Sequence, residues 1–316
     1  MALPIFPYED IQRIGKTGIR SLHAMPQKMR RRQVGRQYGI CHMKSWPVVA
    51  RAALHFYEEP CISGEQGSGA VFFSGCNLRC VFCQNHEISR GKAGQVIDTG
   101  RLAEIFLELQ DKKANNINLV TGVMFIPTIV EALKRAKDQG LGIPVIYNSG
   151  GYESVEALRL LEGWVDVYLP DFKCMSRELG RRYFGAPDYA EEAKAAIWEM
   201  VRQEPQVVFD ERGFITHGVI VRHLVLPGQR KEAERILRYL YEQYGDRIYL
   251  SIMNQYTPMK GIDLPDRELG RRLTTYEYQK VIDYALSIGI TKAYMQIGKT
   301  ADESFVPPFD LEGVEK

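Results

Sequence analysis

From about residue 68 onward, short runs of β-branched and aromatic residues alternate with segments whose apolar residues recur at helical spacing. The run 70–74 is apolar and bounded by glycines, which is typical of a buried strand. In the segment 101–110, one helical face carries the apolar residues Leu102, Ile105, Phe106 and Leu109. The whole pattern predicts strands over 70–74, 118–121, 144–147, 165–170, 219–226, 248–253 and 293–297. It predicts helices over 101–110, 127–137, 154–161, 191–202, 231–244 and 276–288.

These elements form at least six strand-then-helix units without an internal sequence repeat. Such alternation predicts an α/β fold in which helices cover a parallel sheet. Periodicity alone leaves open whether the sheet is doubly wound or forms a full or partial barrel. In either case, we expect functional residues where strands end and loops begin. The runs 207–209 and 214–216 flank Glu211-Arg212-Gly213, which indicates a hairpin.

Residues 1–60 lack this alternation, so we expect a short N-terminal extension over 1–60 and a barrel-type domain over 61–316. The extension carries a basic cluster at Lys28, Arg30, Arg31, Arg32 and Arg36. Such a cluster is usually a solvated helix face or a flexible arm, and contact with an acidic partner is the alternative.

Composition excludes several classes of protein. Lys and Arg number 41 against 39 Asp and Glu, a net charge of +2, which makes nucleic acid an unlikely partner and gives no attraction to anionic membranes. Hydrophobic residues make up 45% and charged residues 25%, the mixture of an ordinary globular chain. No run of about 18 apolar residues is present, and residues 1–10 do not resemble a secretory signal. We therefore expect a cytoplasmic protein without a membrane partner.

The chain has six cysteines, at positions 41, 61, 76, 80, 83 and 174. Without a secretory signal, cysteines indicate metal binding or catalysis before disulfides. Cys76, Cys80 and Cys83 follow the first predicted strand with the spacing Cys-x3-Cys-x2-Cys. Three thiolates so close together can hold one soft metal centre, and they suit a four-iron cluster that keeps one iron open. Structural zinc usually takes four protein ligands, so a three-cysteine zinc site and three unrelated thiols are the weaker alternatives.

The cysteine loop resembles that of the radical S-adenosylmethionine (SAM) superfamily. The segments 67–80, 222–228 and 253–256 resemble more narrowly the homologues of pyruvate formate-lyase activating enzyme, and the likeness extends over about residues 60–310. This resemblance implies a partial (β/α)6 barrel, with Cys76, Cys80 and Cys83 binding a [4Fe–4S] cluster and SAM chelating the fourth iron. It also implies that the reduced cluster cleaves SAM to methionine and a 5′-deoxyadenosyl radical, which abstracts hydrogen from a substrate.

The resemblance implies partners as well. The cluster needs a reductant such as flavodoxin or ferredoxin, and the substrate would be a glycine in a partner glycyl-radical enzyme. Because one fold hosts many radical reactions, modification of a small molecule or of another polypeptide stays open. A non-catalytic iron–sulfur binding module is the third possibility. The basic cluster at 28–36 would help to dock a macromolecule and mildly favours a protein substrate.

The loop and the first strand ends offer candidate cofactor contacts. By resemblance, Phe82 lies near adenine, and Asn85 could bond the adenine edge; ordinary core packing is the alternative for Phe82. The second strand ends at Thr121 and Gly122, where the superfamily commonly has Gly-Gly-Glu-Pro against the SAM amino group. This chain lacks the glutamate, so backbone carbonyls would make the contact, and a simple turn glycine is an equal alternative.

The next two predicted strand ends add polar candidates to the site. Asn148 and Ser149 precede two glycines, which permit close approach of the backbone to a ligand, although a plain loop is an equal alternative. Asp171 and Lys173 lie two residues apart and so point the same way in an extended segment, where they could bind ribose hydroxyls and the methionine carboxylate. An exposed ion pair is the alternative.

The longest strand-like run contains Arg222, His223 and Leu224. Alternation sends Arg222 and His223 to opposite faces. The resemblance directs Arg222 into the cavity and places Leu224 near adenine, whereas His223 is expected to be a core histidine. Cys174 is expected to be a packed thiol, and Cys41 and Cys61 are expected to be inert.

Overall fold

The computed structural model describes residues 46–258, 264–296 and 306–315. The basic cluster at 28–36 and Cys41 lie outside the described residues. Among the described helices, none is both long and apolar enough to cross a membrane.

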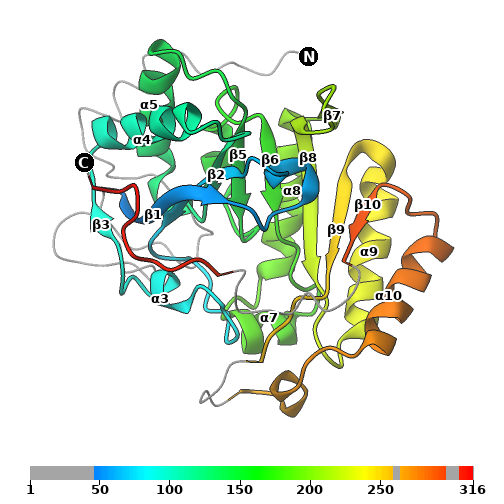
Figure 1. Cartoon of the computed structure of the whole chain (residues 1–316). Helices are drawn as coiled ribbons and strands as arrows, with labels where there is room; N and C mark the ends of the chain where they lie inside the picture. The colour runs from blue at the N-terminus through cyan, green and yellow to red at the C-terminus, as the bar shows by residue number, and fades with distance from the viewer. Residues whose placement is uncertain (1–45, 259–263, 297–305, 316) are drawn as a thin grey trace.

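A single sheet organises the described chain, with strand order β10-β9-β8-β6-β5-β4-β2-β1-β3 (Figure 1). All strands from β2 to β10 on this path pair in parallel. These are β2 (Ser68–Phe73), β4 (Ile117–Val120), β5 (Val145–Ser149), β6 (Val167–Pro170), β8 (Ile215–Leu224), β9 (Tyr249–Met253) and β10 (Ala293–Met295). A helix follows each of the first six, so the predicted partial (β/α)6 barrel is confirmed.

The helices cover the outer face of the sheet (Figure 1). The longer ones are α4 (Thr99–Asp111), α5 (Ile126–Asp138), α6 (Val155–Arg159), α7 (Arg177–Phe184), α8 (Tyr189–Gln203), α9 (Arg230–Tyr244) and α10 (Thr275–Ser287). In α4, the predicted apolar face is buried, and the Asp98 side chain caps the first turn by accepting from the Arg101 amide. Thr274 and Glu277 form a reciprocal capping box at the start of α10.

Strand β2 shows how the sheet separates two environments. All six of its residues are buried, as expected for a parallel strand covered on both faces. Val71 and Phe73 belong to the main core shared with the helices, whereas Ala70 and Phe72 pack with Ile88 in a second, smaller cluster. The alternation of β2 therefore directs Phe72 away from the main helical core.

The predicted hairpin is confirmed by β7 (Val208–Phe209), which pairs antiparallel with the start of β8. The structure adds the short elements α2 (Pro60–Ser63), α3 (His86–Ser89), β3 (Gln95–Val96), η2 (Val123–Phe125), η3 (Gly245–Arg247) and η4 (Arg267–Gly270).

The described part of the predicted extension contains a strand of the sheet. β1 (Val48–His55) pairs antiparallel with β2 over most of its length, so residues 48–55 are continuous with the sheet. The chain end lies along β1 as well: the Leu311 amide donates to the Ala50 carbonyl at 3.1 Å, and the Ala52 amide donates to Glu312 at 2.8 Å. Arg51 pairs with Asp310 and Glu312. Residues 48–55, which lie within the predicted extension 1–60, therefore form part of the sheet next to β2.

Candidate active site

A cavity of about 270 Å³ lies where the parallel strands end. Its walls come from the loop after β2 and from the ends of β4, β5, β6, β8 and β9. Of the predicted site residues, those lining it are Cys76, Cys80, Phe82, Cys83, Asn85, Thr121, Asn148, Ser149, Asp171, Lys173, Arg222 and Leu224. Segments more than 100 residues apart in sequence therefore meet at one place.

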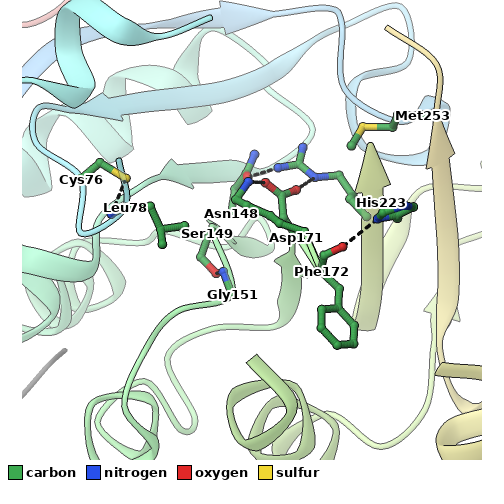
Figure 2. Close-up of polar contacts among 12 residues, drawn as sticks. Cys76, Leu78, Asn148, Ser149, Gly151, Asp171, Phe172, His223 and Met253 are labelled. Carbon is green, nitrogen blue, oxygen red and sulfur yellow. Dashed lines mark hydrogen bonds and ion pairs between the residues drawn. The ribbon is translucent and has the colours of Figure 1, made fainter. Parts of the chain in front are cut away.

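The cysteine loop is tied to its surroundings through its backbone. The Gly75 amide donates to Ile88 at 2.7 Å, and the Arg79 and Val81 amides donate to the carbonyls that end α7. Within the loop, the Leu78 amide donates to the Cys76 sulfur at 3.4 Å (Figure 2). The backbone bonds to Ile88 and to the end of α7 hold the loop at the cavity wall without using its thiols.

The three thiols of the loop are free and partly buried. Burial, together with the neighbouring thiols, raises the pKa of Cys76 to about 11 and that of Cys80 to about 12. The charge of Lys173 opposes both shifts. Among the described residues, no three His, Cys, Asp or Glu side chains are arranged to share a single metal ion. A four-iron cluster does not need that convergence, because each thiolate binds a different iron.

Asp171 and Lys173 point the same way, as predicted, and form an ion pair with Nζ and Oδ2 at 2.6 Å. The other oxygen of Asp171 accepts from Arg222 Nε at 3.0 Å (Figure 2). Burial alone would raise the pKa of Asp171, but the charges of Lys173 and Arg222 outweigh it and lower that pKa. Burial would likewise lower the pKa of Lys173, and Asp171 raises it above its usual value. The pair is therefore charged, and it faces the cavity with about a fifth of each side chain exposed.

Arg222 is held on three sides. Besides Asp171, its guanidinium donates to Asn148 Oδ1 at 2.6 Å and to Glu58 Oε2 at 3.0 Å. Glu58 follows β1 and lines the cavity. Glu58 is not predictable from the sequence, because its contacts are made with residues at least 60 positions away. The only local signal is a pair of consecutive glutamates before a proline. On the opposite face of β8, His223 Nδ1 lies 2.8 Å from the Phe172 carbonyl (Figure 2).

The turn after β4 contains two predicted site residues, Thr121 and Gly122, which have different roles. Thr121 adopts φ +61°, a left-handed conformation that costs a β-branched residue roughly 1–3 kcal/mol. Its amide donates to the Asn148 carbonyl at 2.9 Å, which ties the strained turn to β5. Gly122 is not in the cavity lining: a Cβ there would lie 2.5 Å from Ile129, so this glycine packs against α5.

The turn after β5 brings two loops together. Gly151 has φ +72°, and a Cβ on it would overlap the carbonyl oxygen of Asp171. Close backbone approach was predicted here, but at Gly151 it is to a neighbouring loop. Ser149 lines the cavity, and its hydroxyl donates to Glu153 Oε2 at 3.2 Å. Burial raises the pKa of Glu153 to about 7.

The remaining candidates have mixed environments. The Phe82 ring lines the cavity and also makes edge contacts with Phe184 and Tyr256, at centroid distances of 5.7 and 5.4 Å. Asn85 occupies the N-cap position of α3, but its side chain makes no capping bond there. Cys61 and Cys174 are buried thiols, as expected.

Comparisons with known proteins agree with this geometry. The family model described as "Radical SAM superfamily" matches residues 70–240. An uncharacterized protein of Methanocaldococcus jannaschii is 31% identical over 265 residues, which is 81% of this chain and 72% of that protein.

Two solved structures of SuiB from Streptococcus suis are also similar to this chain. The first, with SuiB bound to the precursor peptide SuiA, has a TM-score of 0.47 at 11% identity and covers 68% of this chain. The second has a TM-score of 0.45 at 12% identity and covers 73%. This chain spans less than half the length of either, at 44% and 48%. The family model, which covers more than half of this chain, and the archaeal relative together carry the conclusion: the chain belongs to the radical SAM superfamily, whose members use a [4Fe–4S] cluster and SAM.

Proposed function

We propose that Cys76, Cys80 and Cys83 bind three irons of the [4Fe–4S] cluster and that SAM occupies the cavity beside them. One observation carries this assignment: the three thiols and the charged group Asp171, Lys173 and Arg222 line the same cavity. A thiol-only donor set suits iron–sulfur ligation, and the positive charge of the irons would offset the burial penalty on the thiolates that form when the thiols lose their protons.

The cofactors supply the chemistry, which is reductive cleavage of SAM to a 5′-deoxyadenosyl radical. The residues of the chain bind these cofactors and orient them. Lys173 pairs with the methionine carboxylate, Asp171 accepts from the ribose hydroxyls, and Arg222 fixes the Asp171 carboxylate in that position. Lys173 is suited to this role because it interacts electrostatically with Cys80 and Cys76 as well as with Asp171.

The rest of the lining orients the two ends of SAM. Phe82 and Leu224 pack on adenine, and Asn85 bonds its polar edge. At the other end, the backbone carbonyl of Thr121, which lines the cavity, accepts from the amino group; Gly122 packs against α5 and supports this turn. Asn148 and Ser149 form part of the cavity wall against which SAM would lie. The strained turn at Thr121 supports this assignment, because such conformations cluster at functional sites.

We further propose that the substrate is a polypeptide, specifically a glycine of a partner glycyl-radical enzyme, and that flavodoxin or ferredoxin supplies the electron. Superfamily membership itself requires a one-electron reductant. Tyr57 lines the cavity while remaining 52% exposed, and the neighbouring Phe56 is also exposed. Exposed aromatic side chains beside a site favour a protein partner over a small solute. The motifs at 222–228 and 253–256, which resemble those of activating enzymes, favour glycine.

Isotope transfer tests this proposal. Candidate partner proteins are labelled with glycine deuterated at the α-carbon and mixed with reduced, cluster-loaded protein and SAM. We expect deuterium in 5′-deoxyadenosine, detected by mass spectrometry, because the radical would take the α-hydrogen of glycine. The same partner carrying Ala at the target glycine is the control and should give unlabelled product. Deuterium that appears equally with this control would contradict the assignment of glycine.

A further inference from the structure

Glu58 belongs to the segment before the barrel, yet its carboxylate lies among the barrel strands. It follows β1 by three residues, and only 10% of its side chain is exposed. Its Oε2 accepts from Arg222 Nη1 at 3.0 Å. Its Oε1 accepts from Asn148 Nδ2 at 3.1 Å and from Asn118 Nδ2 at 3.2 Å. One carboxylate therefore joins β4, β5 and β8 across the interior.

The contacts of Glu58 match a group whose two oxygens both accept hydrogen bonds. All three partners are donors, and both oxygens of Glu58 serve as acceptors. A glutamine at this position could turn its carbonyl toward either Arg222 or the asparagines, and its amide N–H would then oppose a donor on the other side. Because three of roughly four acceptor sites are already filled, Glu58 has little capacity left for a ligand and acts through its partners.

Of the three partners of Glu58, Arg222 carries a charge and depends most on this contact. Its Nε donates to Asp171, its Nη2 to Asn148 and its Nη1 to Glu58, so each nitrogen has its own acceptor. Without Glu58, the guanidinium would keep a hydrogen bond to one carboxylate, that of Asp171, and Asp171 already pairs with Lys173 at 2.6 Å. The guanidinium of Arg222 would then be free to rotate, and the Asp171 carboxylate bonded to it would no longer be held in one orientation.

We propose that Glu58 is a positioning residue for the SAM site: it holds Arg222 and Asn148 in place, and through Arg222 it sets the direction of Asp171. This inference rests on the proposed role of Asp171 and Lys173 in binding SAM. It makes the segment after β1 a functional part of the barrel rather than an appendage to it.

The chain offers a matched control in the next residue. Glu59 is also buried, and within the described part of the chain its Oε2 has no hydrogen-bond partner. Burial raises the pKa of Glu59, although the charge of Arg222 opposes this shift. Among the described residues, Glu59 receives none of the three hydrogen bonds that Arg222 donates. Glu59→Gln should therefore be nearly silent, whereas Glu58→Gln removes a charge that three donors use.

The first measurement is equilibrium dialysis of SAM against reconstituted protein, with iron and sulfide content measured on each sample. We expect Glu58→Gln to weaken SAM binding about tenfold or more, the effect of losing one charged hydrogen bond, at unchanged cluster content. Glu59→Gln should stay within about twofold of the unmodified protein. In an Arg222→Lys background, Glu58→Gln should add little, because contacts in one network are not additive.

The second measurement needs no cofactor. In nitrogen-15 NMR of the cofactor-free protein, the Arg222 Nε–Hε signal, identified by its loss in Arg222→Lys, should shift and broaden in Glu58→Gln and stay in place in Glu59→Gln. An unmoved signal would overturn the positioning role, as would a Glu58→Gln protein that is less stable yet binds SAM normally. If the unmodified protein binds no SAM, the proposed function fails, and the NMR result alone decides the role of Glu58.

Discussion

At the scale of single residues, Glu153 is a carboxyl behind the cavity wall whose pKa is raised by burial. It is 1% exposed, and the hydroxyl that bonds it belongs to Ser149, which lines the cavity. Burial raises its pKa from 4.5 to about 7. Between these two values the folded protein keeps a proton that the unfolded chain has released. The free energy of unfolding should therefore fall as the pH rises through this range.

Urea unfolding of the cofactor-free protein at pH 5 and pH 8 measures this effect. At 1.36 kcal/mol per pKa unit, the ionisation of Glu153 should remove about 3 kcal/mol of stability across the range. Glu153→Gln, which cannot ionise, should lose this pH dependence. Glu131→Gln, at an exposed site on α5, should keep it. A Glu153→Gln protein with the original pH dependence would show that another group carries it.

At the scale of elements, the packing of the β5 turn against the β6 turn sets the place of Asp171. Gly151 makes this possible, because it combines φ +72° with direct contact to the Asp171 carbonyl. Gly151→Ala should destabilise the fold through both the backbone conformation and the overlap. Gly140 is a matched control: it has φ +100°, but a Cβ there meets nothing within 4 Å.

Both alanine variants bear the cost of a positive φ, and only Gly151→Ala adds a steric clash. We expect Gly151→Ala to lower the free energy of unfolding by at least about 2 kcal/mol more than Gly140→Ala, measured by urea denaturation. Equal losses in the two variants would mean that the β5 and β6 turns separate without cost.

The elements also show what the sequence could predict. The parallel strands β2, β4, β5, β6, β8 and β9 were predictable because each contains a short buried run next to turn residues, and their order follows from right-handed β–α–β connections. β1 was missed because Arg51 and several alanines interrupt its apolar pattern; the structure covers Arg51 with acidic residues from the chain end. α7 was missed because it is highly charged and contains Gly180, which the Ala186 carbonyl approaches too closely for a side chain.

The candidate site likewise contains residues that the sequence could predict and one that it could not. Cys76, Cys80 and Cys83 were predictable because the loop concentrates them, and Asp171 and Lys173 because a two-residue spacing in extended backbone directs both side chains the same way. Glu58 was not predictable, because its partners Asn118, Asn148 and Arg222 become neighbours only when the sheet forms.

At the scale of the whole molecule, both ends of the described chain contribute to the same wall of the barrel (Figure 1). Residues 306–315 run beside β1, and Phe309 packs edge-on against Phe72 at a centroid distance of 5.7 Å. Val306 and Pro307 line the cavity. The cavity is therefore a product of the full described chain rather than of the residues 70–240 that match the family model.

The most direct test of the central claim is the formation of 5′-deoxyadenosine. The protein is reconstituted with iron and sulfide without oxygen, reduced with dithionite and given SAM, and the product is measured by liquid chromatography and mass spectrometry. We expect product from the unmodified protein and from Cys61→Ala, whose thiol is packed away from the loop, and none above background from Cys80→Ala. A cluster-loaded, reduced protein that forms no 5′-deoxyadenosine, or a Cys80→Ala protein as active as Cys61→Ala, would contradict the account.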